Sequence, residues 1–161
     1  MHRVAQLVGH LTARVSAGDL ALAHEILPPS AWALFDAMPV ADQRHGLDVT
    51  GRLLARGIDD REVLAAALLH DVAKGTRLRV WHRVGGVLLS ALAPRALQRL
   101  ATPDPASRGY PWHLFLHHAE LSAQVARDAG LSERTAAFIR ARTLEADRAL
   151  AQALHDADEV S

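Results

Sequence analysis

Apolar residues recur at helical spacing over nearly the whole of this 161-residue chain, and this periodicity restricts its fold more than any other feature. Strand signals are scarce, because neither a run of alternating β-branched residues nor an Asn-Gly hairpin turn occurs. We therefore predict an all-α fold. The predicted helices span residues 2–17, 19–26, 30–37, 41–56, 60–73, 80–92, 94–101, 111–129, 132–142 and 144–159.

The breaks between these helices are short and have the residues typical of helix ends. Pro28-Pro29 ends one helix, Gly57 follows another, and Gly75 closes the helix that carries His70. Neither a linker-like stretch nor an internal repeat divides the chain. We expect a single-domain helical bundle, with a core of Leu, Ala and Val because aromatic residues make up only 4% of the chain.

The composition argues against several classes of protein. Basic and acidic residues number 18 each, so no overall attraction to nucleic acid or anionic membranes is expected. The longest apolar run, Val63 to Leu69, is far shorter than the roughly 20 residues of a membrane span. We expect a cytoplasmic protein with no DNA, RNA or membrane partner, and a homo-oligomer is left open. Cysteine is absent, so a metal ion would bind His, Asp or Glu.

Of the 10 histidines, the informative ones face the core beside a carboxylate. His45, Val49 and Leu53 are spaced at i, i+4 and i+8, so His45 lies on an apolar helical line. The segment 63–69 is apolar on every side, so its helix should be buried, and it runs directly into His70-Asp71. A buried carboxylate is costly unless it is paired or binds a cation. A hydrogen-bonded His–Asp pair would satisfy Asp71, whereas a metal ion would also give His45 a role.

A further ligand is expected near the C-terminus, where two aspartates are candidates. Asp158 shares a helical line with Leu150 and Leu154, so it should face inward. Asp156 aligns with Gln152, which is a more polar direction. We prefer Asp158 as the ligand; Asp156 remains the alternative, and so does a solvated acidic tail that binds nothing.

The helix predicted at residues 111–129 carries three neighbouring histidines. His118 shares an apolar line with Leu114, whereas His113 and His117 lie on a polar line. His118 is therefore the interior candidate, either for a substrate phosphate or second metal ion, or simply as a core residue.

Basic residues gather between Asp71 and Asp104, where no acidic residue occurs. They are Lys74, Arg77, Arg79, Arg83, Arg95 and Arg99. Lys74 lies about one helical turn beyond His70-Asp71, and a cationic segment beside a metal suits a phosphate ligand. Solvated helix faces are the alternative, above all for Arg95 and Arg99.

Three pieces of this pattern resemble the HD superfamily of metal-dependent phosphohydrolases. They are Gln43-Arg44-His45, the string AALLHDVAK at residues 66–74, and Ala157-Asp158. The resemblance covers residues 41–161 as an HD domain and leaves residues 1–40 as N-terminal helices that pack on its core. It implies an HD-type bundle with one divalent ion, which could be Mn, Fe, Co, Ni, Zn or Mg. The implied ligands are His45, His70, Asp71 and Asp158.

The chain also departs from the branches of that superfamily that bind two metals. The segment 118–122 is similar to their later histidine motif, but Ser122 stands where they have Gly. Their further histidine on the next helix is missing here, where the chain has Arg142. These differences favour a single metal ion, with His118 and Arg142 near the substrate.

The resemblance implies an enzyme that hydrolyses a phosphate ester or anhydride, with a nucleotide as the expected substrate. The expected catalytic residues are Asp71, Lys74 and His118. The expected phosphate-binding residues are Lys74, Arg77 and Arg142. The alternatives are a non-catalytic nucleotide- or metal-binding regulatory module, and a protein-interaction domain without a metal.

Overall fold

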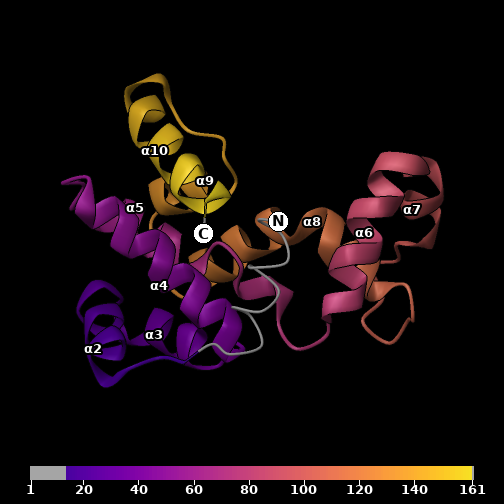
Figure 1. Ribbon diagram of the computed structural model, residues 1–161, viewed down its shortest axis with the longest axis horizontal. Helices are drawn as coiled ribbons and strands as arrows, with labels where there is room; N and C mark the ends of the chain where they lie inside the picture. The colour runs from indigo at the N-terminus through magenta and orange to yellow at the C-terminus, as the bar shows by residue number, and fades with distance from the viewer. Residues whose placement is uncertain (1–13, 161) are drawn as a thin grey trace.

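The computed structural model describes residues 14–160, and all regular structure in that part of the chain is helical (Figure 1). This confirms the predicted all-α, single-domain bundle. The α-helices are α2 (Ala17–Ile26), α3 (Pro29–Asp36), α4 (Val40–Ala55), α5 (Arg61–Leu69), α6 (Val80–Leu92), α7 (Pro94–Leu100), α8 (Tyr110–Asp128), α9 (Glu133–Ile139) and α10 (Arg148–Glu159). Two short 3-10 helices, η1 (Val72–Lys74) and η2 (Glu145–Asp147), lie between them.

The first predicted helix, at residues 2–17, falls almost entirely outside the described residues. The next one begins at Ala17, earlier than expected, because Ser16 and Asp19 form a reciprocal cap. The Ser16 hydroxyl accepts a hydrogen bond from the Asp19 amide at 3.2 Å, and the Asp19 carboxylate accepts one from the Ser16 amide at 2.9 Å. Such a capping box satisfies two amide groups that a helix start leaves unpaired.

The helix that was predicted to continue to residue 73 ends at Leu69, so this boundary was wrong. His70 and Asp71 occupy a turn, and η1 follows them. The amide of Ala73 would donate to Leu69 in a continued helix, but it donates instead to the Ser122 hydroxyl of α8, at 3.1 Å. A contact with a distant helix thus ends α5, and it leaves both candidate ligands on irregular backbone.

Helix α5 forms the centre of the core. Every residue from Val63 to Leu69 is buried, and α2, α3, α4, α9 and α10 all pack against this helix. Phe35 of α3 is fully buried, and the centre of the partly buried Trp32 ring lies 5.8 Å from the centre of the Phe35 ring. The described part of the N-terminal region therefore belongs to the same core as the helices after residue 40.

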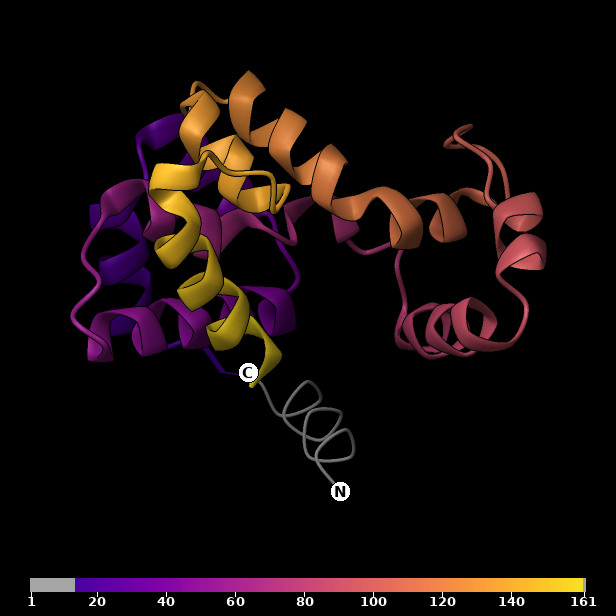
Figure 2. The same cartoon turned by 90° about the horizontal axis from the view of Figure 1, so that it is seen from above.

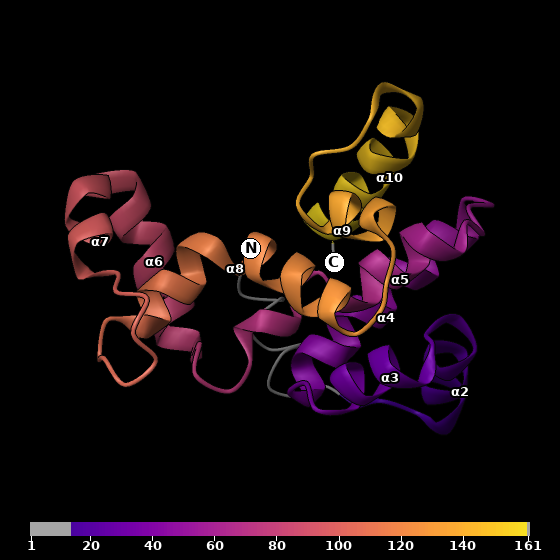
Figure 3. The same ribbon diagram turned by 180° about the vertical axis from the view of Figure 1, so that it is seen from behind.

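Helix α8 extends from this core to a separate pair of helices (Figures 2 and 3). It contacts α9 and η1 on the core side, and α6 and α7 at its other end. We call α6 and α7 together the α6–α7 arm. Among the described helices, none is both long enough and apolar enough to cross a bilayer.

Candidate metal centre

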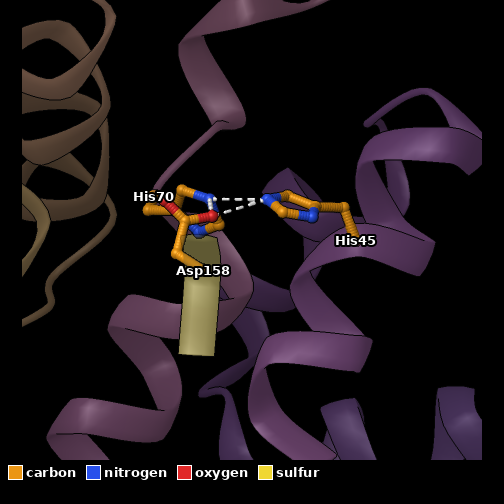
Figure 4. Close-up of side chains that lie close together, drawn as sticks. All are labelled: His45, His70 and Asp158. Carbon is orange, nitrogen blue, oxygen red and sulfur yellow. Dashed lines mark hydrogen bonds and ion pairs between the residues drawn. The ribbon is translucent and has the colours of Figure 1, made fainter. Parts of the chain in front are cut away.

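Three side chains from separate parts of the chain meet beside the core (Figure 4). They are His45 of α4, His70 in the turn after α5, and Asp158 of α10, and we call them the His–Asp cluster. The Nε2 atoms of His45 and His70 are 3.2 Å apart. Asp158 Oδ1 lies 2.8 Å from Nε2 of His45 and 3.4 Å from Nε2 of His70. Two ring nitrogens and a carboxylate oxygen therefore face one point.

The close approach of α4 and α5 brings the two histidines together. A Cβ atom added at Gly46 would lie 3.0 Å from the Leu68 carbonyl oxygen and 3.2 Å from that of Ala67. Any larger side chain would push the helices apart, because these neighbours are backbone atoms that cannot easily move. Gly46 follows His45 directly, so the narrow crossing fixes the position of the His45 ring relative to His70.

The backbone orients the His70 ring. Its Nδ1 atom lies 2.9 Å from the carbonyl oxygen of Ala67, which can only accept a hydrogen bond. Nδ1 therefore carries a proton, and in the neutral ring Nε2 offers its lone pair to the cluster. Metal-binding histidines are commonly held in this way by a hydrogen bond from the second ring nitrogen.

Of the two C-terminal aspartates, the structure brings Asp158 to the histidines. Asp156 lies on another side of α10, where its carboxylate accepts a hydrogen bond from Gln152 at 2.8 Å and lies 3.9 Å from Arg56. The apolar line through Leu154 correctly indicated which aspartate faces the other helices, because Leu154 is buried in the core.

Asp71 lies deeper, beside the cluster. Its side chain is only 3% exposed, and its Oδ2 accepts a hydrogen bond from the Lys74 ammonium at 2.5 Å. Its Oδ1 is buried without a hydrogen-bond partner, 3.7 Å from His70 Nε2. An unpaired buried carboxylate oxygen is costly. Asp71 is outside the compact group of three, so a cation at the cluster would have to draw its Oδ1 closer.

The donor set fits a divalent cation. Imidazole and carboxylate ligands bind such ions at about 2.0–2.2 Å, which places neighbouring ligand atoms about 2.8–3.6 Å apart. The three separations in the cluster run from 2.8 to 3.4 Å. The side chains are also within reach of solvent, because His45 is 28% exposed and Asp158 42% exposed.

The charges in the cluster strongly perturb its pKa values. Burial would lower the pKa of His70, but the Asp71 charge and the Asp158 carboxylate outweigh it and raise that pKa to about 9. Burial opposes ionisation of Asp158, but hydrogen bonds from His45 and His70 hold its pKa well below the usual range. The pKa of Asp71 is likewise low, because the charges of His70 and Lys74 outweigh its burial. Both carboxylates are therefore anionic and attract a cation. At neutral pH the metal-free His70 ring is protonated, so a metal ion would have to displace its Nε2 proton.

His118 faces the same region from α8. Its Nδ1 atom lies 3.0 Å from the Phe115 carbonyl oxygen, so Nδ1 carries the proton. Burial and the nearby Lys74 charge lower the pKa of His118, which favours the neutral ring. A neutral His118 with a lone pair on Nε2 is better suited to accept a proton than to protonate a leaving group.

The two expected phosphate-binding arginines have other surroundings. The Arg77 guanidinium donates to the Pro105 carbonyl and lies 5.7 Å from the centre of the Tyr110 ring. Arg142 is exposed after the end of α9. Among the described residues, no contact joins either arginine to the His–Asp cluster, so their role in phosphate binding stays a prediction.

Two residues that position the site were not singled out for that role from the sequence. Gly46 allows the helix crossing, and a glycine inside a predicted helix was a usable signal for close packing. Ser122 accepts the hydrogen bond that ends α5, and it stands where the resembling motif has Gly. Nothing in the local sequence indicates the contact between Ser122 and Ala73.

No family model matches the chain, and no match was found among curated proteins or solved structures.

Proposed function

We propose that this protein is a metal-dependent phosphohydrolase of the HD type that acts on a phosphate ester or anhydride, with a nucleotide as the expected substrate. The observation that carries the proposal is the convergence of His45, His70 and Asp158 next to the unpaired Oδ1 of Asp71. A proton shared between the histidines and Asp158 would satisfy those three side chains. It would leave the Oδ1 atom of Asp71 without a hydrogen-bond partner, whereas a divalent cation suits all four side chains.

In this proposal His45, His70, Asp71 and Asp158 hold one divalent cation. When bound, such an ion activates water as a nucleophile by lowering its pKa toward about 7, and it offsets charge on a phosphoryl group. The residues around it act in defined ways. The Ala67 carbonyl keeps the His70 ring oriented, and Lys74 holds the Asp71 carboxylate from its other oxygen.

In this arrangement Lys74 and His118, which lie close to Asp71 and His70, would act on a phosphate and on an attacking water. The Lys74 ammonium carries a positive charge beside the cluster and is 18% exposed, so it can contact a phosphoryl oxygen. The Nε2 lone pair of His118 can accept a proton or a hydrogen bond from water. The structure therefore favours His118 as a base.

Metal content provides the direct test. The purified full chain, incubated with Mn²⁺ or Zn²⁺ and dialysed, should retain about one equivalent by elemental analysis. His70→Ala, Asp71→Ala and Asp158→Asn should each weaken binding at least about tenfold and abolish turnover of a panel of nucleotides and phosphate esters. Asp156→Asn is the matched control, because it makes the same change about half a helical turn away on α10. It should alter neither metal binding nor turnover.

Two outcomes would contradict the proposal. Equal metal loss in Asp158→Asn and Asp156→Asn would mean that the ion does not bind at the cluster. Turnover that persists after the metal has been removed would mean that the chemistry does not depend on it.

The surroundings of the two arginines favour a second candidate, which is a module that binds a nucleotide or metal without turnover. Arg77 contacts Pro105 and Tyr110, and Arg142 is exposed, so among the described residues neither arginine adds positive charge beside the cluster. Such a module would be stabilised by its ligand, by about 2.7 kcal/mol at a concentration 100 times the dissociation constant, and would form no product. Thermal unfolding and product analysis on the same samples distinguish the two functions.

A further inference from the structure

The outward side of the α6–α7 arm is apolar, and nothing in residues 14–160 covers it. Its large exposed apolar side chains are Trp81, Val84, Val87, Leu88, Leu92 and Leu100. Trp81 is 59% exposed, Leu88 55% and Leu92 83%. Positions 81, 84, 88 and 92 follow each other along one helical line, so they form a continuous stripe. Contiguous apolar patches of this kind mark interaction surfaces rather than ordinary exposed residues.

The apolar stripe of α6 faces outward because the opposite side of this helix packs against α8. A Cβ atom at Gly86 would lie 2.7 Å from the Phe115 ring, and one at Gly85 would lie 3.1 Å from the Trp112 ring. The buried His82 ring also lies 5.3 Å from the Trp112 ring. The Trp81 ring lies 6.0 Å from the same ring, so Trp81 stands at the edge between the packed and the outward side of α6. The two glycines therefore let α6 lie directly on the aromatic residues of α8. Rotating α6 to hide the stripe would drive larger side chains into those rings.

The arm also carries unbalanced positive charge, although the chain as a whole has a net charge of zero. Arg95 and Arg99 of α7, and Arg79 directly before α6, are exposed, and none of the three forms an ion pair within the described residues. Arg83 is different, because it pairs with Asp42 of α4. No acidic residue occurs between Asp71 and Asp104 to offset this charge.

We propose that the outward face of the arm binds the surface of an anionic lipid bilayer. The leucines, valines and Trp81 would enter the region between headgroups and acyl chains, and Arg95 and Arg99 would contact lipid phosphates. The 13-residue α6 is too short to span a bilayer and would lie along its surface. This differs from the sequence expectation of no membrane partner. That expectation followed from the overall charge of the chain and the length of its apolar runs, and neither describes a local surface such as the arm.

Two other occupants fit the face less well. A second copy of the chain would bring the same unpaired arginines against each other, and like charges oppose association. Single-stranded nucleic acid is bound by aromatic stacking, but apart from Trp81 the large apolar side chains of the face are aliphatic. An anionic bilayer matches both the aliphatic surface and the positive charge.

Co-sedimentation of the full chain with vesicles tests the proposal. Binding is expected to vesicles of equal parts phosphatidylcholine and phosphatidylglycerol, to weaken with added salt, and to be much weaker to phosphatidylcholine alone. Arg95→Gln combined with Arg99→Gln should weaken binding roughly 30-fold, since each basic side chain near an anionic surface strengthens it about fivefold. Leu88→Gln combined with Leu92→Gln should weaken it at least about tenfold.

Matched controls make the same chemical changes elsewhere. Arg14→Gln with Arg148→Gln removes the same charge, and Leu144→Gln replaces a leucine that is 77% exposed outside the arm. All controls should bind as the unchanged protein does. Circular dichroism checks that each variant is folded, and because the arginine pair is fully on the surface, its result does not depend on the leucine pair.

Several results would overturn the proposal. These are equal binding to both kinds of vesicle, controls that weaken binding as much as the arm variants, and a dimer in sedimentation equilibrium that Leu88→Gln with Leu92→Gln dissociates. Oligonucleotide binding that is lost with Arg95 and Arg99, without vesicle binding, would also overturn it.

Discussion

At the scale of single residues, two small features shape the candidate site. The missing side chain of Gly46 lets α4 touch the backbone of α5, and this sets the distance between His45 and His70. The Oδ1 atom of Asp71 is buried without a hydrogen-bond partner, which costs free energy. The first feature brings the two histidines together, and the second leaves a buried carboxylate oxygen beside them that the proposed cation would satisfy.

Gly46→Ala tests the role of the helix crossing. The added methyl group would meet the Leu68 carbonyl at 3.0 Å, so we expect a loss of about 1–3 kcal/mol in the free energy of unfolding, together with weaker metal binding as His45 moves. Gly51→Ala, in the same helix, has nothing within 4 Å of the new atom and should stabilise the protein by about 0.5–1 kcal/mol. Urea denaturation measures both, and equal effects would contradict the close-contact explanation.

At the scale of the elements, one ion pair ties the α6–α7 arm to the core. Arg83 of α6 donates two hydrogen bonds to the Asp42 carboxylate of α4, at 2.7 and 2.9 Å. Asp42 is only 1% exposed and lies one helical turn before His45. The same helix that carries a candidate ligand therefore also anchors the arm, which otherwise packs mainly on α8.

Arg83→Met should be distinctly destabilising, because it leaves the Asp42 charge buried without its partner. Losing one partner of a fully buried pair costs about 3–5 kcal/mol, and we expect about 2 kcal/mol here since Arg83 is 26% exposed. Arg99→Met, an exposed arginine of the arm without an ion pair among the described residues, should change the free energy of unfolding by less than about 0.5 kcal/mol. If Arg83→Met and Arg99→Met both change the free energy of unfolding by a similar, small amount, the Arg83–Asp42 pair contributes little to stability.

At the scale of the whole molecule, Arg134 connects three separate parts of the chain. Its guanidinium pairs with Asp60 at the start of α5, at 2.9 Å, with Glu62 at 2.7 Å, and with Asp147 of η2 at 2.8 Å. Asp60 also caps α5 by accepting hydrogen bonds from the Glu62 and Val63 amides. This network links α9 and the C-terminal segment to the central helix.

The network predicts a particular loss of stability in acid. Hydrogen bonds from Arg134 outweigh partial burial and lower the pKa of Asp60 below its ordinary value of 3.8. Because the pKa of Asp60 is lower in the folded state, the pairing contributes its full stability above pH 3.8, the ordinary pKa of the group. This stability is lost as the pH falls through the lower pKa of the folded state. Arg134→Met should therefore be less stable than the unchanged protein at neutral pH, and the difference should narrow in acid.

Urea denaturation across that pH range measures the difference. Arg148→Met is the control, because Arg148 and its partner Glu145 are 75% and 76% exposed, and a pair so open to solvent should give no difference at any pH. If the difference in free energy of unfolding between Arg134→Met and the unchanged protein stays constant into acid, the Asp60 carboxylate is not the source of the stabilisation.

The sequence by itself determined the helical class, most helix positions and the side of α10 that faces inward. These follow from the spacing of apolar residues, because helix formation depends on hydrogen bonds and side chains within a few turns. That is why the spacing alone favours Asp158 over Asp156 as the inward-facing aspartate. Metal binding and hydrolysis stay predictions.

Only the tertiary structure decided the turn at His70-Asp71, the surroundings of Arg77 and Arg142, and the exposed face of the α6–α7 arm. The turn depends on Ser122, which is 49 residues away from Ala73 in the chain. From its spacing alone, the apolar stripe of α6 could equally have been a buried face. It is exposed because α6 packs on α8 through the opposite side, which carries Gly85 and Gly86. Such outcomes arise from competition among contacts between distant residues, and periodicity within one helix carries no information about them.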